Sequence, residues 1–182
     1  MITTSIDIII NSIVDNEIVS IPTDTVYGLS CIINKTAVDK LIDLKQRDSS
    51  KGFIIISHDV EHLLKYTDTS RLSNKQILKL KALQSQPTTW IVPAKDDIQW
   101  LTGNKPTIAI RLVQTTEIQK ICSSLDNSVI ISTSANISGQ TFINNAQSIS
   151  KVFSDIMVFD NKLETQATPS RILNISTGEK IR

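Results

Sequence analysis

Hydroxyl and carboxylate side chains are concentrated near the start of the chain, between residues 20 and 29. An apolar run at 17–21 should end as a strand at Pro22, which has no backbone N–H to donate. The loop that follows holds two hydroxyls, a carboxylate and a glycine, which are Thr23, Asp24, Thr25 and Gly28. Such a loop can approach a ligand closely, but it also suits an ordinary polar turn.

Cationic side chains suited to phosphate or carboxylate groups occur at three further places. Lys45 and Arg47 close a predicted helix, and Lys51 follows them. Cations in the last turn of a helix are also stabilised by its dipole, by up to about 1 kcal/mol, without any ligand. Arg111 ends the apolar run 107–111, where a strand should emerge from the sheet. In α/β folds that edge is where ligands bind.

A run of small polar residues includes Ser132, Ser134 and Asn136 at alternate positions. If the strand geometry persists, these three side chains share one face, although a polar strand-to-helix turn has the same pattern. The five glycines are too widely spaced for a G-x-G-x-x-G or Walker-type loop. Any phosphate would therefore be held by cations and hydroxyls.

A metal-binding pattern, H-x-x-E-H, occurs at His58 and His62. These are the two histidines of the chain, and no motif supplies a third ligand. We therefore predict ordinary helix residues here and no protein-bound metal.

Composition indicates one domain spanning 1–182. Cys31 and Cys122 belong to no C-x-x-C motif, which favours two core residues in a reducing compartment. The N-terminus has no basic segment before its apolar residues, so we expect a cytoplasmic, soluble protein with no membrane contact. A net charge of +1 argues against a protein that coats polyanions.

Two periodicities alternate along the chain. Apolar residues at helical spacing predict helices at residues 6–14, 36–44, 59–65, 73–84, 115–125 and 145–153. Short apolar runs predict strands at residues 17–21, 53–57, 88–93, 107–112, 128–132, 156–159 and 170–175. This interleaving predicts an α/β fold with a mixed, largely parallel sheet flanked by helices.

Five segments, in order, resemble the YrdC-like threonylcarbamoyl-AMP synthases, especially their short, single-domain, TsaC-like members. The segments are 22–29, 45–47 with 51–52, 107–111, 132–139, and 169–172 with 177–182. The most specific features are the K-x-R pair at Lys45 and Arg47 and the S-x-N pair at Ser134 and Asn136. The resemblance implies the YrdC-like fold, a twisted sheet with an open cationic cleft.

The resemblance also implies a reaction. L-threonine, bicarbonate or CO₂, and ATP would give L-threonylcarbamoyladenylate and pyrophosphate, with Mg²⁺ carried by the nucleotide. The adenylate would pass to the tRNA threonylcarbamoyl-transferase machinery, and weak binding of tRNA would be compatible with this role.

Residue roles follow from the same resemblance, position by position. The threonine-binding residues would be Thr25, Arg111, Ser132 and Ser170. The ATP-binding residues would be Arg47, Lys51, Thr107, Ser134, Asn136 and Arg182. The catalytic residues would be Lys45, Arg47, Ser134 and Asn136.

The chain departs from the family pattern at three places. Asp48 replaces the usual proline after K-x-R, segment 84–90 lacks a glycine, and Arg171 adds a cation near the end. Two other functions stay open, an RNA-binding module with a concave cationic surface and the carbamoyl-transfer domain of hydrogenase-maturation proteins. The sequence has no basic run and few aromatic residues for the first, and too few cysteines for the second.

Overall fold

The computed structural model describes residues 1–161 and 168–182. Within those ranges one sheet holds nine strands. They are β1 (Ile2–Thr3), β2 (Val19–Pro22), β3 (Tyr27–Ile32), β4 (Ile54–Ser57), β5 (Thr88–Pro93), β6 (Thr107–Leu112), β7 (Ile130–Ser134), β8 (Met157–Phe159) and β9 (Arg171–Asn174).

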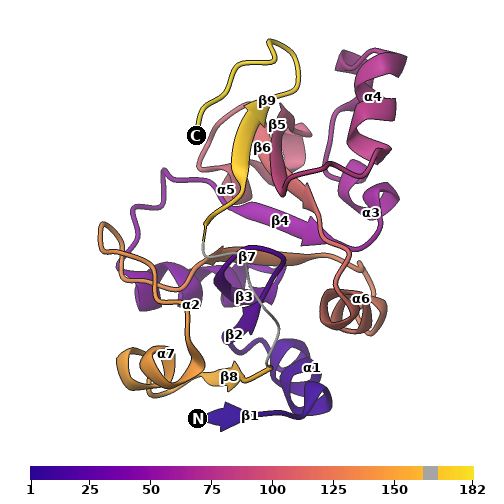
Figure 1. Cartoon of the computed structure of the whole chain (residues 1–182). Coiled ribbons are helices and arrows are strands. Elements are labelled where there is room, and N and C mark those ends of the chain that lie inside the picture. The colour runs from indigo at the N-terminus through magenta and orange to yellow at the C-terminus, as the bar shows by residue number, and fades with distance from the viewer. Residues whose placement is uncertain (162–167) are drawn as a thin grey trace.

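Helices surround this sheet (Figure 1). They are α1 (Ile6–Val14), α2 (Lys35–Lys45), α3 (Val60–Leu64), α4 (Asn74–Lys81), α5 (Gln99–Thr102), α6 (Thr116–Ser123) and α7 (Ala146–Val152), with 3₁₀ turns at Thr69–Arg71 and Asp96–Ile98. Helix α2 is capped by Asn34, whose side chain accepts from the N–H of Ala37, and not by Thr36 as its sequence suggests. None of the helices described here is long and apolar enough to cross a membrane.

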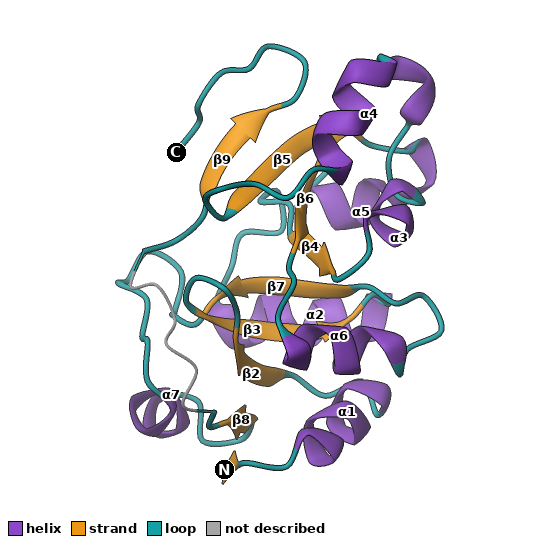
Figure 2. Ribbon diagram, turned by 45° about the vertical axis from the view of Figure 1, so that its right-hand side comes forward, coloured by secondary structure: helices purple, strands orange, loops and turns teal. Residues whose placement is uncertain are grey.

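The strand order is β1-β8-β2-β3-β7-β4-β6-β5-β9. In Figure 2, β9, β5, β6 and β4 form the upper half of the view, and β7, β3, β2 and β8 form the lower half. The predicted mixed α/β sheet is confirmed, but its parallel share is smaller than expected. Of the eight pairings between described strands, four are parallel and four antiparallel. A chain that alternates strands and helices need not make every pair of strands parallel. Strands β2 and β3, for example, form an antiparallel hairpin with no helix between them.

Strand β3 was not predicted, because its segment reads as a loop. Leu29 and Cys31 point into a core, while Gly28 and Ser30 alternate with them on the other face. Strand β7 also runs further than predicted, to Ser134. Consequently Ser132 and Ser134 do lie on one face of a strand.

Alternating strand positions face two cores. The larger core packs β-strand residues such as Leu29 and Ile110 against α2, α3, α4, α5 and α7. The smaller core packs Val19, Ile21 and Ile130 against α1 and α6. Those two helices cover only part of their face, and the uncovered part holds the site described next.

Candidate active site

A cavity of about 440 Å³ lies on the sheet face that α1 and α6 leave uncovered. Strands β3, β4, β6 and β7 supply its floor through Gly28, Ile54, Ala109, Arg111, Ser132 and Ser134. Its rim comes from Thr23, from residues 25–27, 140–142 and 169–170, and from Arg182. Three arginines, and no carboxylate, occur in the described lining: Arg47, Arg111 and Arg182. This distribution of charge favours an anionic ligand.

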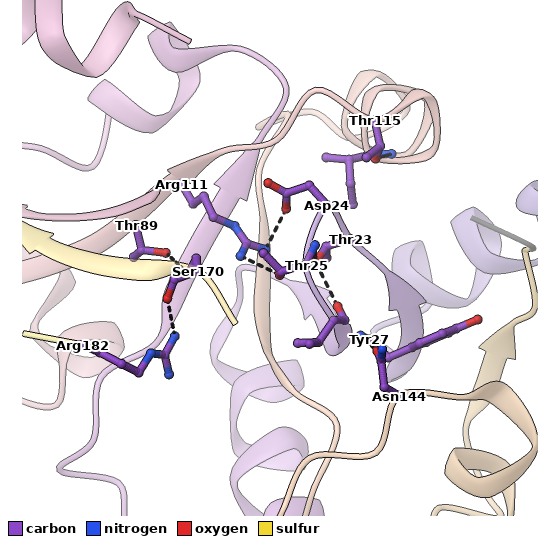
Figure 3. Close-up of polar contacts among 12 residues, drawn as sticks. Thr23, Asp24, Thr25, Tyr27, Thr89, Arg111, Thr115, Asn144, Ser170 and Arg182 are labelled. Carbon is purple, nitrogen blue, oxygen red and sulfur yellow. Dashed lines mark hydrogen bonds and ion pairs between the residues drawn. The ribbon is translucent and has the colours of Figure 1, made fainter. Parts of the chain in front are cut away.

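Arg111 is the most buried of the three arginines, with 6% of its surface exposed. Its Nη1 donates to the hydroxyl of Thr25 at 3.0 Å, and its Nη2 lies 3.4 Å from Oδ1 of Asp24 (Figure 3). Its Nε has no hydrogen-bond acceptor among the described residues. The guanidinium is therefore fixed from the loop side and has one buried donor without a described partner.

Burial lowers the pKa of Arg111, the charge of Asp24 opposes this shift, and the charge of Arg182 adds to it. A guanidinium stays protonated in proteins even so. The buried charge is only partly offset by Asp24, whose side chain is 25% exposed. An added carboxylate or phosphate would complete the pairing.

The β2–β3 loop holds a row of hydrogen-bonded hydroxyls next to Arg111, and the donor of each bond can be assigned. The hydroxyls of Thr23 and Thr25 are 3.0 Å apart, and the Thr23 hydroxyl donates to the carbonyl of Val26 at 2.9 Å. Thr25 must then donate to Thr23 while it accepts from Arg111. The loop is thus an ordered binding wall rather than an exposed turn.

The opposite wall joins β5 to the segment before β9. The hydroxyls of Thr89 and Ser170 are 2.8 Å apart and buried. Arg182 donates from Nη2 to the carbonyl of Ser170 at 3.1 Å (Figure 3). Ser170 and Arg182 therefore reach the cavity together, as the sequence predicted for each.

Strands β3 and β7 approach each other closely at Gly28. A Cβ added there would lie 2.4 Å from the hydroxyl oxygen of Ser132. Glycine leaves room for this hydroxyl to lie over the strand at the edge of the cavity.

Arg47 lies in the loop after α2 and is held by that loop's own carbonyls. Its Nη2 donates to Gly52 at 2.9 Å, and its guanidinium carbon is 5.1 Å from the centre of the Phe53 ring. A Cβ on Gly52 would lie 2.6 Å from the carbonyl oxygen of Thr102, so the loop packs directly on the end of α5. Burial lowers the pKa of Arg47, and Asp48 opposes the shift.

Lys45, Ser134 and Asn136 form an internal network. The ammonium of Lys45 donates to the carbonyls of Ser134 and Asn136 and to Oδ1 of Asn136. The hydroxyl of Ser134 donates to the same Oδ1 at 2.7 Å. Ser134 and Asn136 line the cavity, whereas Lys45 lies beneath them.

Most of the predicted site residues meet at this cavity. Those in its lining are Thr25, Arg47, Arg111, Ser132, Ser134, Asn136, Ser170 and Arg182. Three others lie outside it, namely Lys45, Lys51 and Thr107. Lys51 is exposed. Thr107 is on the same strand as Ala109 but beyond the lining.

Sequence reasoning missed several contributors. Asp24 was noticed as a loop residue without its pairing to Arg111, and Thr89 and Phe142 were not singled out. Asn144 accepts from the backbone N–H of Tyr27 at 3.0 Å and so anchors the start of β3. A hydroxyl at Thr89 inside an apolar strand was the one available signal, because buried hydroxyls need partners.

The H-x-x-E-H pattern is placed away from the cavity. The rings of His58 and His62 have centroids 6.4 Å apart, and Nε2 of His62 lies 4.0 Å from a carboxylate oxygen of Asp59. Among the described residues, no three or more potential ligands form a metal-binding group.

The three departures from the family pattern have local roles. Asp48 accepts from the backbone N–H of Ser50 at 2.9 Å, a bond that lowers its pKa and shapes the turn after Arg47. Arg171 donates from Nε to the hydroxyl of Thr88 at 2.7 Å, which ties β9 to β5. In the glycine-free segment, the Gln84 amide donates to the Ala82 carbonyl at 2.8 Å just after α4.

This fold is an α/β domain, and the arginines of its cavity suit small anionic molecules. Residues 11–182 match the Sua5/YciO/YrdC family, described as "Telomere recombination". The chain belongs to this family, and the resemblance noted in its sequence is confirmed.

Two named relatives cover nearly the whole chain. A threonylcarbamoyl-AMP synthase of Actinobacillus succinogenes is 39% identical over 92% of this chain and 92% of its own length. One from Buchnera aphidicola is 36% identical over 92% of this chain and 97% of its own length.

A solved structure shares the fold. The crystal structure of P. abyssi Sua5 complexed with L-threonine has a TM-score of 0.83 with 24% identity, and it matches 96% of this chain. The present chain spans about half the length of that Sua5, 52%.

Proposed function

We propose that this chain is a threonylcarbamoyl-AMP synthase, acting as one catalytic domain. The observation that carries the proposal is Arg111, a buried guanidinium with an unused Nε donor in a cavity whose described charged residues are all arginines. The reaction combines a carboxylate substrate with a triphosphate, and such a cavity suits both. The names of the two relatives agree with this assignment.

We assign threonine to the end of the cavity formed by Arg111, Thr25, Ser132 and Ser170. The guanidinium binds the carboxylate, and the hydroxyls of Thr25 and Ser170 offer lone pairs to the substrate's amine and hydroxyl. The fold relative Sua5 was crystallised with L-threonine, which supports this choice of amino acid.

We assign ATP to the end formed by Arg47, Ser134, Asn136 and Arg182. The two guanidinium groups would offset the charge on the phosphates. Lys51 and Thr107, which lie just outside the described lining, would be reached only by the outer parts of the nucleotide. The described lining has no acidic side chain, and the Mg²⁺ ion would be carried by the phosphates.

The proposed chemistry needs positioning rather than a covalent enzyme intermediate. The threonine nitrogen attacks the carbon of CO₂ and loses a proton to solvent, which gives a carbamate. A carbamate oxygen then attacks the α-phosphorus of ATP. The bond from that phosphorus to the bridging oxygen breaks, and pyrophosphate leaves with the electron pair. Arg111 orients the nucleophile, and Arg47 and Arg182 stabilise the charge that develops on the leaving group.

We further propose a cytoplasmic location and a tRNA threonylcarbamoyl-transferase system as the consumer of the adenylate. A mixed anhydride of carbamate and phosphate hydrolyses readily, so a dedicated acceptor enzyme should take it up. Direct contact with tRNA would be weak, given the net charge of +1.

The deciding experiment measures pyrophosphate release from ATP with threonine and bicarbonate, omitting each in turn. Release should require all three, and threonine should be preferred to serine and serine to valine. A site that hydrogen-bonds a hydroxyl rejects an isostere that lacks one. Equal rates with valine and threonine would remove the threonine assignment. Pyrophosphate release when both threonine and bicarbonate are omitted would indicate that the protein only hydrolyses ATP to AMP and pyrophosphate.

A further inference from the structure

Lys45, the last residue of α2, has an almost completely buried side chain, 1% exposed. Its Nζ lies 2.6 Å from the carbonyl oxygen of Ser134, 2.7 Å from that of Asn136 and 3.1 Å from Oδ1 of Asn136. An ammonium has three hydrogens, and these three oxygens can accept all of them. The ammonium therefore has no hydrogen left for a ligand in the cavity.

The acceptors of Lys45 belong to one turn, residues 134–140. Within it, the Asn136 side chain accepts from the Ser134 hydroxyl and donates to the carbonyl of Gln140 at 2.6 Å. The turn is also joined to the main chain of Lys45, since the N–H of Ser138 donates to the Lys45 carbonyl at 2.9 Å. Both the side chain and the backbone of Lys45 thus hold this turn against the end of α2.

This turn forms part of the cavity wall through Ser134, Asn136 and Gln140. The turn follows the last residue of β7, and its backbone is joined to other segments at Ala135, which donates to the Tyr27 carbonyl and accepts from the N–H of Ile143. The Asn136 side chain is oriented by Ser134, by Gln140 and by the ammonium of Lys45. Hydrogen bonds to a charged group are stronger than those between neutral groups, and Lys45 supplies three of them.

We infer that Lys45 is a positioning residue, whose ammonium fixes the turn 134–140 so that Ser134 and Asn136 face the nucleotide, and that it does not itself contact phosphate. The identity of the ligand in this inference rests on the proposed function. The structural role of Lys45 does not, because its hydrogen bonds are present in the ligand-free protein. A phosphate could reach the ammonium only by displacing a carbonyl of the turn.

The first test compares hydrogen exchange in ligand-free proteins. Lys45→Met keeps a long apolar stem and removes all three donors. Amide protection across 134–140 should fall at least tenfold in this variant, while protection in β7 before Ser134 changes little. The matched control is Lys40→Met, on the same helix, whose exposed ammonium pairs with Glu17. It should leave the turn as in the wild type. An unchanged turn in folded Lys45→Met would overturn the inference.

Kinetics separate positioning from direct binding. If Lys45 acts through the turn, Lys45→Met and Asn136→Ala should each lower kcat/KM for ATP at least tenfold, and the double variant should be within about threefold of the more impaired single variant. A direct phosphate contact predicts that the two losses multiply, and that result would overturn the inference.

A measurement on the wild type covers the case in which Lys45→Met does not fold. Competitive labelling with an amine-reactive reagent should modify Lys45 at least ten times more slowly than Lys151, which is exposed and outside the cavity lining, with or without ATP. Labelling of Lys45 as fast as Lys151 would show that the ammonium leaves its three oxygens, and would overturn the inference. Neither exchange nor labelling needs turnover, so either can succeed or fail independently of the synthase assignment.

Discussion

The hydroxyl of Thr25 accepts a hydrogen bond from Nη1 of Arg111 at 3.0 Å, across 86 positions of the sequence. This contact connects the β2–β3 loop to the end of β6. Because Thr25 passes its own hydrogen to Thr23, each group in the row has one orientation. The loop and the guanidinium are therefore ordered before a substrate arrives, which lowers the entropy lost on binding.

Arg111→Lys should weaken threonine binding. Lysine keeps the charge but loses the planar fork that binds a carboxylate with two parallel hydrogen bonds. Losing one charge-assisted bond costs about 1.5–3 kcal/mol, so KM for threonine should rise by about tenfold to a hundredfold with a smaller change in kcat. Steady-state kinetics at saturating ATP checks this. Arg171→Lys, which alters a guanidinium outside the cavity, serves as the control, and equal effects of both changes would contradict the assignment.

Arg47→Ala should slow turnover more than it destabilises the fold. If the guanidinium offsets charge on the departing pyrophosphate, its loss should reduce pyrophosphate release by about tenfold to a thousandfold. Arg71→Ala, at an exposed arginine in a 3₁₀ turn, should leave release unchanged. If Arg47 only supports its own loop, a folded Arg47→Ala protein will instead turn over ATP at the normal rate.

Gly28→Ala should displace the hydroxyl of Ser132. The new Cβ would lie 2.4 Å from that oxygen, and the hydroxyl can rotate away at a cost of about 0.5–1.5 kcal/mol. For a chain of this size the melting temperature should fall by about 1–6 °C, and KM for threonine should rise. Adding Ser132→Ala should restore the melting temperature but not KM. A Gly28→Ala protein with the wild-type KM for threonine would show that Ser132 does not contact the substrate.

The free energy of unfolding should depend on pH in a way that reports the burial of Lys45. Burial, and then the charge of Arg47, lowers the pKa of Lys45 from 10.5 to about 8. The unfolded chain therefore binds more protons between these values, and the free energy of unfolding rises with pH across that window. Relative to Lys45→Met, the wild type should gain about 3 kcal/mol between pH 8 and 10.5. Urea denaturation of both proteins at several pH values measures this. A difference that stays flat would show that the pKa of Lys45 is not lowered in the folded protein.

The double change His58→Ala with His62→Ala should leave pyrophosphate release within about threefold of the wild type. Both residues lie outside the cavity lining, and substitutions away from a site have small effects. The assay is repeated with a zinc chelator and with measurement of bound zinc. Joint loss of zinc and activity in the double variant would revive the metal hypothesis.

The elements that were predicted well have strong local signals. Helix α1 was predicted with its observed bounds, because its apolar residues repeat at helical spacing between Ser5 and Asp15. Strand β3 was missed for the opposite reason. One face of β3 carries Gly28, which lines the cavity, and Ser30, which is small and buried, so the apolar alternation typical of a strand is lost.

The residues of the candidate site also differ in how well a local sequence pattern predicts them. Arg111 was found because a charge at the end of an apolar strand is unusual, and a local pattern sufficed. The pairing of Thr89 with Ser170 spans 81 positions and depends on β9 lying beside β5, which no local pattern reveals. The buried state of Lys45 was likewise hidden, since a lysine ending a helix usually lies in solvent.

The position of β9 beside β5 also bears on how the protein is made. Strand β9 is the last described strand to leave the ribosome, yet Ser170 and Arg182 complete a cavity whose floor was synthesised long before. Pairing of such distant segments must overcome loop-closure entropy and is slow. A nascent chain that ends before β9 would therefore carry an almost finished sheet whose cavity lacks one wall. Full ligand affinity would then report that β9 has paired with β5.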